Sequence, residues 1–309
     1  MSVSIWFWIA FHLGVLAALA IDLFSDSAHE RISLRSAIRR TLLWIALSLS
    51  FNALIWWWQG TDRAINFVTC YLIEYSLSVD NIFIFGVIFA YFRVPPQYEH
   101  RVLLWGILGA LIMRAVMIWL GVTLVARFHF VLYLFGTFLL ITGLRMLLGK
   151  SQPLDLENNF VLRATRRLLP VTSDYHGPKF LALVAGRRVL TPLALVLIVI
   201  EVMDLIFAID SIPAVLAITR DTFIVYTSNI CAILGLRSLY FLLSNLMTRF
   251  VFLRVGLAVI LCFVGLKMLA ERWFRLPSWA SLLIIAAILI TTTLASLIAT
   301  KDQPSSSPR

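Results

Sequence analysis

Two stretches of the chain, Tyr71–Phe85 (YLIEYSLSVDNIFIF) and Leu197–Val215 (LIVIEVMDLIFAIDSIPAV), place acidic residues inside long apolar runs. A carboxylate costs free energy in hydrocarbon, and the ionisable residues of membrane segments generally mark a substrate or ion pathway. The two stretches therefore predict a membrane protein and also the position of its functional site. The acids concerned are Glu74, Asp80, Glu201, Asp204 and Asp210.

The composition is that of a membrane protein. Hydrophobic residues make up 61% of the chain, charged residues make up 14%, and the mean hydropathy is +0.93. A soluble core of this size could not bury so much apolar surface. We expect an all-α, polytopic membrane protein with about nine transmembrane helices in a single domain over residues 1–300. The runs long enough to span a bilayer cover roughly residues 4–24, 41–58, 65–91, 101–123, 128–148, 191–219, 223–244, 251–271 and 279–299.

The distribution of Lys and Arg predicts the orientation in the membrane. With the N-terminus outside, 18 of the 26 basic residues fall in the inner loops and tail, six fall outside, and Arg114 and Arg237 lie within runs. Because basic residues accumulate on the cytoplasmic side, we expect the N-terminus outside and the C-terminus in the cytoplasm. The net charge of +10 then reflects topology and contact with anionic lipid, and no nucleic-acid partner is expected.

The longest connection, about residues 149–190, is cytoplasmic in this topology. Phe180–Thr191 (FLALVAGRRVLT) has two short apolar stretches around a glycine, which predicts a small β-hairpin. The tail, residues 301–309 (KDQPSSSPR), has the polar composition of a disordered segment.

The two acidic stretches resemble each other. Aligning Glu74 with Asp204 also places Asp80 on Asp210, with five residues between the acids in both copies. The third to fifth runs thus resemble the sixth to eighth. Three spans separate the starts of the two copies, so the copies are inverted relative to each other in the bilayer. Many secondary transporters are built in this way and bind substrate near the midplane between the repeats. The predicted repeats cover about residues 65–148 and 191–271.

The acids of one stretch do not share a helix face. Residues six apart in a regular helix are rotated by about 240° around its axis, which leaves their side chains about 120° apart. Glu74 and Asp80 therefore converge only if the helix is interrupted. Pro213 removes a backbone donor near Asp210, and Ser78 can bond freed backbone groups. We therefore expect broken helices whose exposed carbonyl groups help to coordinate a cation.

The predicted ligands are carboxylates, an amide, a hydroxyl and backbone carbonyls. These hard oxygen donors suit Mg²⁺, Ca²⁺ or Mn²⁺ rather than zinc or Cu(I). The arginines within the runs could neutralise some acids, and in the competing interpretation such pairs are only structural. The predicted metal-binding residues are Glu74, Asp80, Asn81, Glu201, Asp204, Asp210 and Ser211, supported by Ser78, Arg114, Pro213, Asn229 and Arg237.

Enzymatic chemistry has no signature in the sequence. The chain contains no GxSxG, HExxH, Walker or GxGxxG pattern, so we expect neither an enzyme nor a permanently bound cofactor. Cys70, Cys231 and Cys262 are scattered without CxxC spacing, and we interpret them as small buried hydrophobic residues.

The motifs resemble one membrane-protein family. EYSLSVDN (Glu74–Asn81) and the run from Glu201 to Phe241, EVMDLIFAIDSIPAVLAITRDTFIVYTSNICAILGLRSLYF, are similar to the TerC family of bacterial integral membrane proteins, near its Alx-like branch. The likeness extends over about residues 10–275. It implies a multi-pass protein of the bacterial inner membrane that acts in metal homeostasis, and the predicted acidic, Asn and Ser ligands match the family pattern.

The resemblance implies several functions. Alx-like members are associated with manganese export and TerC-like members with tellurite resistance, and an older description calls Alx-like proteins redox modulators. We expect a transporter of a divalent cation, with Mn²⁺ as the expected substrate. A site that binds either a dication or protons could couple this export to the proton gradient. The alternatives are a redox modulator or scaffold, and a partner that supplies metal to exported proteins. The protein partners are unknown from the sequence.

Overall fold

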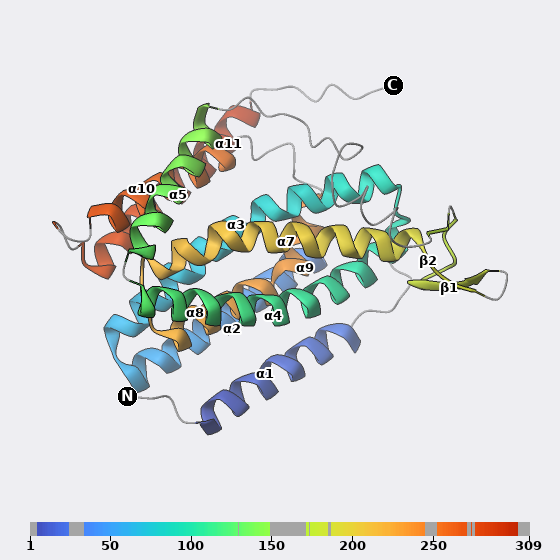
Figure 1. The fold of residues 1–309 in the computed structure, drawn as a ribbon, viewed down its shortest axis with the longest axis horizontal. Coiled ribbons are helices and arrows are strands. Elements are labelled where there is room, and N and C mark those ends of the chain that lie inside the picture. Colours follow the sequence, from blue (N-terminus) through green and yellow to red (C-terminus); the bar gives the residue numbers. More distant parts are fainter. Residues whose placement is uncertain are drawn as a thin grey trace.

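The protein is a bundle of helices with one β-hairpin at its edge (Figure 1). The computed structural model describes residues 5–24, 34–128, 130–148, 171–172, 174–184, 187–244, 252–270, 273 and 276–301. The elements are α1 (Ile5–Phe24), α2 (Leu34–Gln59), α3 (Thr61–Phe92), α4 (Pro96–Arg127), α5 (Val131–Leu148), β1 (Leu181–Val184), β2 (Arg187–Leu190), α7 (Pro192–Leu216), α8 (Thr222–Leu234), α9 (Leu236–Ser244), α10 (Leu253–Ala270) and α11 (Ser278–Lys301).

The helices have the lengths that a membrane requires. In the described part of the chain, seven segments are long and apolar enough to cross a bilayer: α2, α3, α4, α5, α7, the pair α8–α9, and α11. Shorter apolar stretches lie in α1, at Ile5–Ile21, and in α10, at Val255–Ala270. The expectation of an all-α, multi-pass membrane protein is confirmed.

Helix α3 lies at the centre of the bundle. It packs against α2, α7, α8, α9 and α11, while α4 packs mainly against α7 and α8. In Figure 1 α5, α10 and α11 lie together at one end of the bundle, where α11 packs on α3 and α5 packs on α7, and α1 lies along the opposite edge. Many outward apolar side chains, such as Leu13 on α1 and Ile112 on α4, are exposed, as expected of residues that face lipid.

The central helices are continuous, and the expected interruptions are wrong. Helix α3 runs without a break through Glu74 and Asp80, and α7 continues through Pro213 to Leu216. Pro213 lies in the last turn of α7, so the missing amide deprives only the carbonyl of Ile209 of its usual intrahelical partner. A break occurs instead between α8 and α9, inside a stretch that the sequence presents as one run.

Glycines bring helices α5 and α10 into backbone contact. A Cβ atom added to Gly143 would lie 2.8 Å from the carbonyl oxygen of Ala258, and one added to Gly265 would lie 2.8 Å from the carbonyl oxygen of Gly136. The pairing of 143 with 258 and of 136 with 265 shows that the two helices are antiparallel. Small residues commonly allow such close approach in membranes.

The predicted hairpin is confirmed. Strands β1 and β2 are antiparallel, with Leu181 opposite Leu190. Thr191 joins the hairpin to α7, because its hydroxyl donates to the carbonyl of Lys179 at 2.7 Å and accepts from the amide of Ala194 at 3.4 Å as the helix N-cap. The remainder of the predicted cytoplasmic loop at residues 149–170, the turn residues 185–186 and the tail at residues 302–309 lie outside the described residues.

The contact between α5 and α10 makes a prediction about stability. Replacing Gly265 with Leu forces side-chain atoms into the backbone of α5, and such overpacking typically costs about 1–3 kcal/mol. We expect Gly265→Leu to lower the melting temperature of the purified protein in detergent. Gly14→Leu is the matched control, because nothing lies within 4 Å of a Cβ added at Gly14. Equal melting temperatures for the two variants would contradict the close packing.

Candidate functional site

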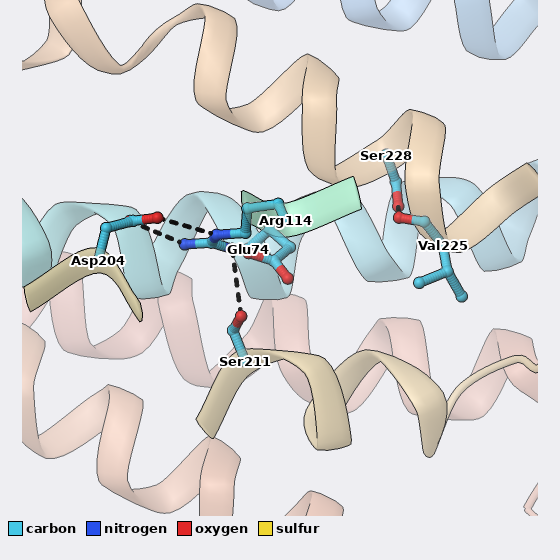
Figure 2. A network of polar contacts seen from close by, with 6 residues as sticks. All are labelled: Glu74, Arg114, Asp204, Ser211, Val225 and Ser228. Atoms are coloured by element: carbon cyan, nitrogen blue, oxygen red, sulfur yellow. Dashed lines mark hydrogen bonds and ion pairs between the residues drawn. The ribbon is translucent and has the colours of Figure 1, made fainter. Parts of the chain in front are cut away.

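A buried arginine binds one acid from each of the two acidic stretches. Arg114 on α4 donates through Nη1 to Oε2 of Glu74 on α3 at 2.8 Å. Its Nη2 and Nε atoms donate to the two carboxylate oxygens of Asp204 on α7, at 3.1 and 3.3 Å. Nη1 also lies 3.2 Å from the hydroxyl of Ser211, which accepts a hydrogen bond. Figure 2 shows the guanidinium between these side chains. Three helices are thus joined at one cation.

The network lies deep inside the bundle. Arg114 and Glu74 are each 1% exposed, and Asp204 is 6% exposed. Arg114 is about 27 Å along α4 from Pro96 and about 20 Å from Arg127, at 1.5 Å per residue. All three charged groups therefore lie near the middle of helices that are long enough to span the membrane.

The charges and hydrogen bonds of this network are incomplete. Two carboxylates face one guanidinium, which leaves one negative charge in excess when both acids are ionised. The second carboxylate oxygen of Glu74, Oε1, is buried without a hydrogen-bond partner among the described residues. A buried acceptor without a partner costs free energy, so the site is poised to accept a further proton or cation.

A third acid, Glu201, lies on the same face of α7 as Asp204, since residues three apart are neighbours on a helix. Its carboxylate lies against Gly109 of α4, and a Cβ atom added to Gly109 would overlap it. The absent side chain at Gly109 therefore makes space for a carboxylate at the interface of α4 and α7. The sequence did not indicate this role.

The other predicted ligands are distributed around the two helices. Asp210 on α7 is half-buried and, in a continuous helix, points about 120° away from Asp204. It is not among the described partners of Arg114. Asn81 and Ser78 are buried on α3, and the side chain of Asp80 lies outside the described residues. Asn229 on α8 is 1% exposed, and its Oδ1 atom has no hydrogen-bond partner within the described structure.

Arg237 lies at a different level of the bundle. Its Nη1 atom is 3.4 Å from Nδ1 of His100, near the start of α4, and the neighbouring Tyr240 donates to Glu99 at 3.1 Å. His100 is about 21 Å along α4 from Arg114. Of the two arginines within the apolar runs, Arg114 contacts the predicted acids, whereas Arg237 belongs to a separate polar cluster.

A further ion pair joins the first turn of α3 to the N-cap residue of α8. Nη2 of Arg63 lies 3.1 Å from Oδ2 of Asp221, and Asp221 also caps α8 by accepting from the amide of Phe223 at 3.0 Å. An Asp before a helical run is a typical N-cap, and that signal could have identified Asp221 in the sequence.

The described side chains do not form a ready metal centre. The side chain of Asp80 is not among those described. Among the described side chains, no group of three or more His, Cys, Asp or Glu residues is placed to hold a metal ion. In this arrangement the acids bind a guanidinium instead. Coordination of a metal ion by Glu74 and Asp204 therefore requires Arg114 to move.

Comparison with known proteins identifies the family. Residues 59–304 match the integral membrane protein TerC family. The chain belongs to the TerC family. An uncharacterized membrane protein of Myxococcus xanthus is 45% identical over 301 residues, covering 97% of this chain and 94% of the relative. The Alx protein of Salmonella typhi is 44% identical and that of Escherichia coli K12 is 42% identical, each over 92% of both chains.

The names of the two Alx relatives describe them as candidate membrane-bound redox modulators. No solved structure shows significant similarity to this TerC-family chain. The resemblance noted in the sequence is thus confirmed at the level of the family.

The buried network predicts an asymmetric response to charge removal. Arg114→Gln leaves two buried carboxylates without their cation, and breaking such a pair typically costs about 3–5 kcal/mol. We expect a large fall in the melting temperature, measured in detergent with a metal chelator present. Arg63→Gln, which breaks a partly exposed pair, should cost about 1 kcal/mol or less. Equal falls in melting temperature for the two variants would contradict the role of Arg114 as a buried counter-ion of two carboxylates.

Proposed function

We propose that this TerC-family protein exports a divalent metal cation across the bacterial inner membrane, and that Mn²⁺ is its main substrate. The single observation that carries the proposal is the convergence of Glu74 and Asp204 on one buried cation near mid-membrane. Intramembrane acids on separate helices that meet at one point are typical of ion pathways. The neighbouring Glu201 carboxylate and the Ser211 hydroxyl supply further hard oxygen donors, which favour Mn²⁺ over softer metals.

The proposal includes nine transmembrane helices and an inverted repeat. Contacts between α5 and α10 support the repeat, because Gly143–Leu147 (GLRML) and Gly265–Leu269 (GLKML) can be aligned. This alignment also superposes Gly136 on Ala258. Gly143 contacts Ala258, and Gly265 contacts Gly136, so each contact is the counterpart of the other, as in a two-fold interface.

The packing of the other helices supports the same relation. In the proposed repeat α7 is the counterpart of α3, and α8 is the counterpart of α4. Helix α3 packs on α8, and α7 packs on α4. The aligned acids Glu74 and Asp204 bind the same guanidinium, as expected for equivalent positions near a two-fold axis. Transporters of this design bind substrate between the repeats.

The polar clusters along the bundle support a pathway that is closed at both ends. In the proposed orientation the Arg63–Asp221 pair lies toward the outside, and the cluster around His100 and Arg237 lies toward the cytoplasm. Arg114 lies between them. Alternating access then requires these clusters to open in turn, and exchange of the metal for protons at the acids would couple export to the proton gradient.

The proposed orientation predicts which side of the membrane reaches each loop. Leu183 on the hairpin is 72% exposed and Trp273 between α10 and α11 is 80% exposed. In a background with Cys70, Cys231 and Cys262 replaced by Ala, we expect a membrane-impermeant maleimide to label Trp273→Cys in intact cells and Leu183→Cys only after lysis. The opposite pattern would reverse the assigned orientation.

A flux assay tests the transport function. We expect the wild-type protein in proteoliposomes to admit Mn²⁺, measured as quenching of a trapped metal-sensitive dye, at a rate that responds to an imposed pH gradient. Asp204→Asn and Asp210→Asn should reduce the rate to that of empty liposomes, because each removes an intramembrane anion. Asp62→Asn, an exposed acid in the first turn of α3, is the control and should transport normally. Wild-type flux equal to that of empty liposomes would refute the function.

The names of the relatives favour a redox role as the second candidate. The three cysteines lie on different helices, α3, α8 and α10, and all are free thiols. We propose that the protein is not an enzyme and that its thiols are packing residues. A variant with all three cysteines changed to Ala should therefore retain Mn²⁺ flux. If flux persists in the wild type but this folded variant loses it, a thiol function gains support.

A further inference from the structure

We propose that Arg114 is a tethered competitor of the transported cation. Its guanidinium lies between Glu74 and Asp204, where the metal ion would bind, and the substrate enters by displacing it. This inference rests on the proposed transport function and assigns Arg114 the role of a gatekeeper that a purely structural ion pair would not have.

The geometry supports a shared position for the two cations. The guanidinium contacts Asp204 through two nitrogens and Glu74 through one, at 2.8 to 3.3 Å. Both carboxylates therefore point at a single point between α3, α4 and α7 (Figure 2). Any cation that binds both acids in this arrangement must occupy that point, so it excludes the guanidinium.

The unpartnered oxygen of Glu74 points to a ligand other than arginine. Oε1 of Glu74 is buried and accepts no hydrogen bond from the described residues, whereas Arg114 donates to Asp204, to Ser211 and to the other Glu74 oxygen. A guanidinium has fixed donor directions, whereas a metal ion is a compact charge that a carboxylate can bind through either or both of its oxygens. A metal ion would therefore satisfy this carboxylate better than Arg114 does.

The charge balance makes the exchange selective for a dication. Arg114 supplies one positive charge against two carboxylates, and a monovalent ion would supply no more. A dication supplies two charges and neutralises both acids. Sodium or potassium thus gains nothing by replacing the guanidinium, so the arginine also keeps the pathway closed to abundant monovalent ions.

Glu201 is placed to receive the displaced guanidinium. Glu201 lies one turn before Asp204 on α7, and Gly109 lies five residues before Arg114 on α4. The carboxylate of Glu201 lies against Gly109, on the face of α7 that also carries Asp204. A shift of Arg114 from Asp204 to Glu201 would keep the guanidinium paired while the metal ion binds.

Titration with MnCl₂ tests the competition. We expect Arg114→Gln, destabilised without metal, to bind Mn²⁺ about tenfold or more tightly than the wild type, because no part of the population is held by the internal competitor. Its melting temperature should therefore rise more with Mn²⁺ than that of the wild type. A merely structural arginine predicts the reverse, and equal or weaker binding in folded Arg114→Gln would overturn the proposal.

Two further variants keep the outcome decisive. If Arg114→Gln cannot be purified even with Mn²⁺, Arg114→Lys is used. Its single ammonium cannot pair with both acids in the same way, so its affinity for Mn²⁺ should rise several-fold, and an unchanged or lower affinity would refute the proposal. Arg127→Gln, at the exposed C-terminal end of the same helix, is the control and should bind as the wild type does.

The same titration separates the two proposals. If wild-type protein and Asp204→Asn both fail to bind Mn²⁺ and the wild type moves none into proteoliposomes, the transport function and this inference fail together. If the wild type binds and transports Mn²⁺ but removal of the guanidinium does not tighten binding, only the role of Arg114 as a competitor fails.

Discussion

The pairing of Arg114 with Glu74 and Asp204 is the constraint on which the arrangement of the central helices depends. Three charges held in an interior of low dielectric interact strongly and tolerate little displacement. Because each comes from a different helix, α3, α4 and α7 are held at one depth and one rotation. A small rotation of any of them would leave a buried charge without its partner, which costs far more than an apolar mismatch.

Close packing around this network limits the ways in which it can rearrange. On α4, Gly106 and Gly121 lie against Ile200 and Ile212 of α7, on either side of the glycine that meets Glu201. These contacts run in the same direction along both helices, so α4 and α7 are parallel and in contact over much of their length. A change at the site is therefore more easily made by side-chain exchange, or by movement of α4 and α7 together, than by separation of the two helices. If the metal ion displaces Arg114 as proposed, metal binding exchanges one cation for another and leaves most of the helix contacts in place.

Much of the fold could be predicted from the sequence because apolar length and acidic residues are local signals. The apolar runs predicted the helices, and the glycine between two short apolar stretches predicted the hairpin. The acids indicated a site near the middle of α3 and α7. The expected break at Pro213 was wrong, since a proline in the last turn can be accommodated without ending a helix. The shared arginine could only be named as a supporting residue, because nothing local indicates that Arg114 reaches Asp204, which lies 90 residues later. The role of Gly109 depends on a neighbouring helix and has no local signal.

The most direct measurement is an experimental structure of the protein in lipid nanodiscs, determined with a chelator and again with Mn²⁺. We expect the guanidinium to lie between the carboxylates of Glu74 and Asp204 in the metal-free structure. In the structure with Mn²⁺, we expect a metal ion at that position and Arg114 displaced from it. Carboxylates directed to separate surfaces in the metal-free state, or Mn²⁺ bound elsewhere while the arginine keeps both partners, would contradict these expectations.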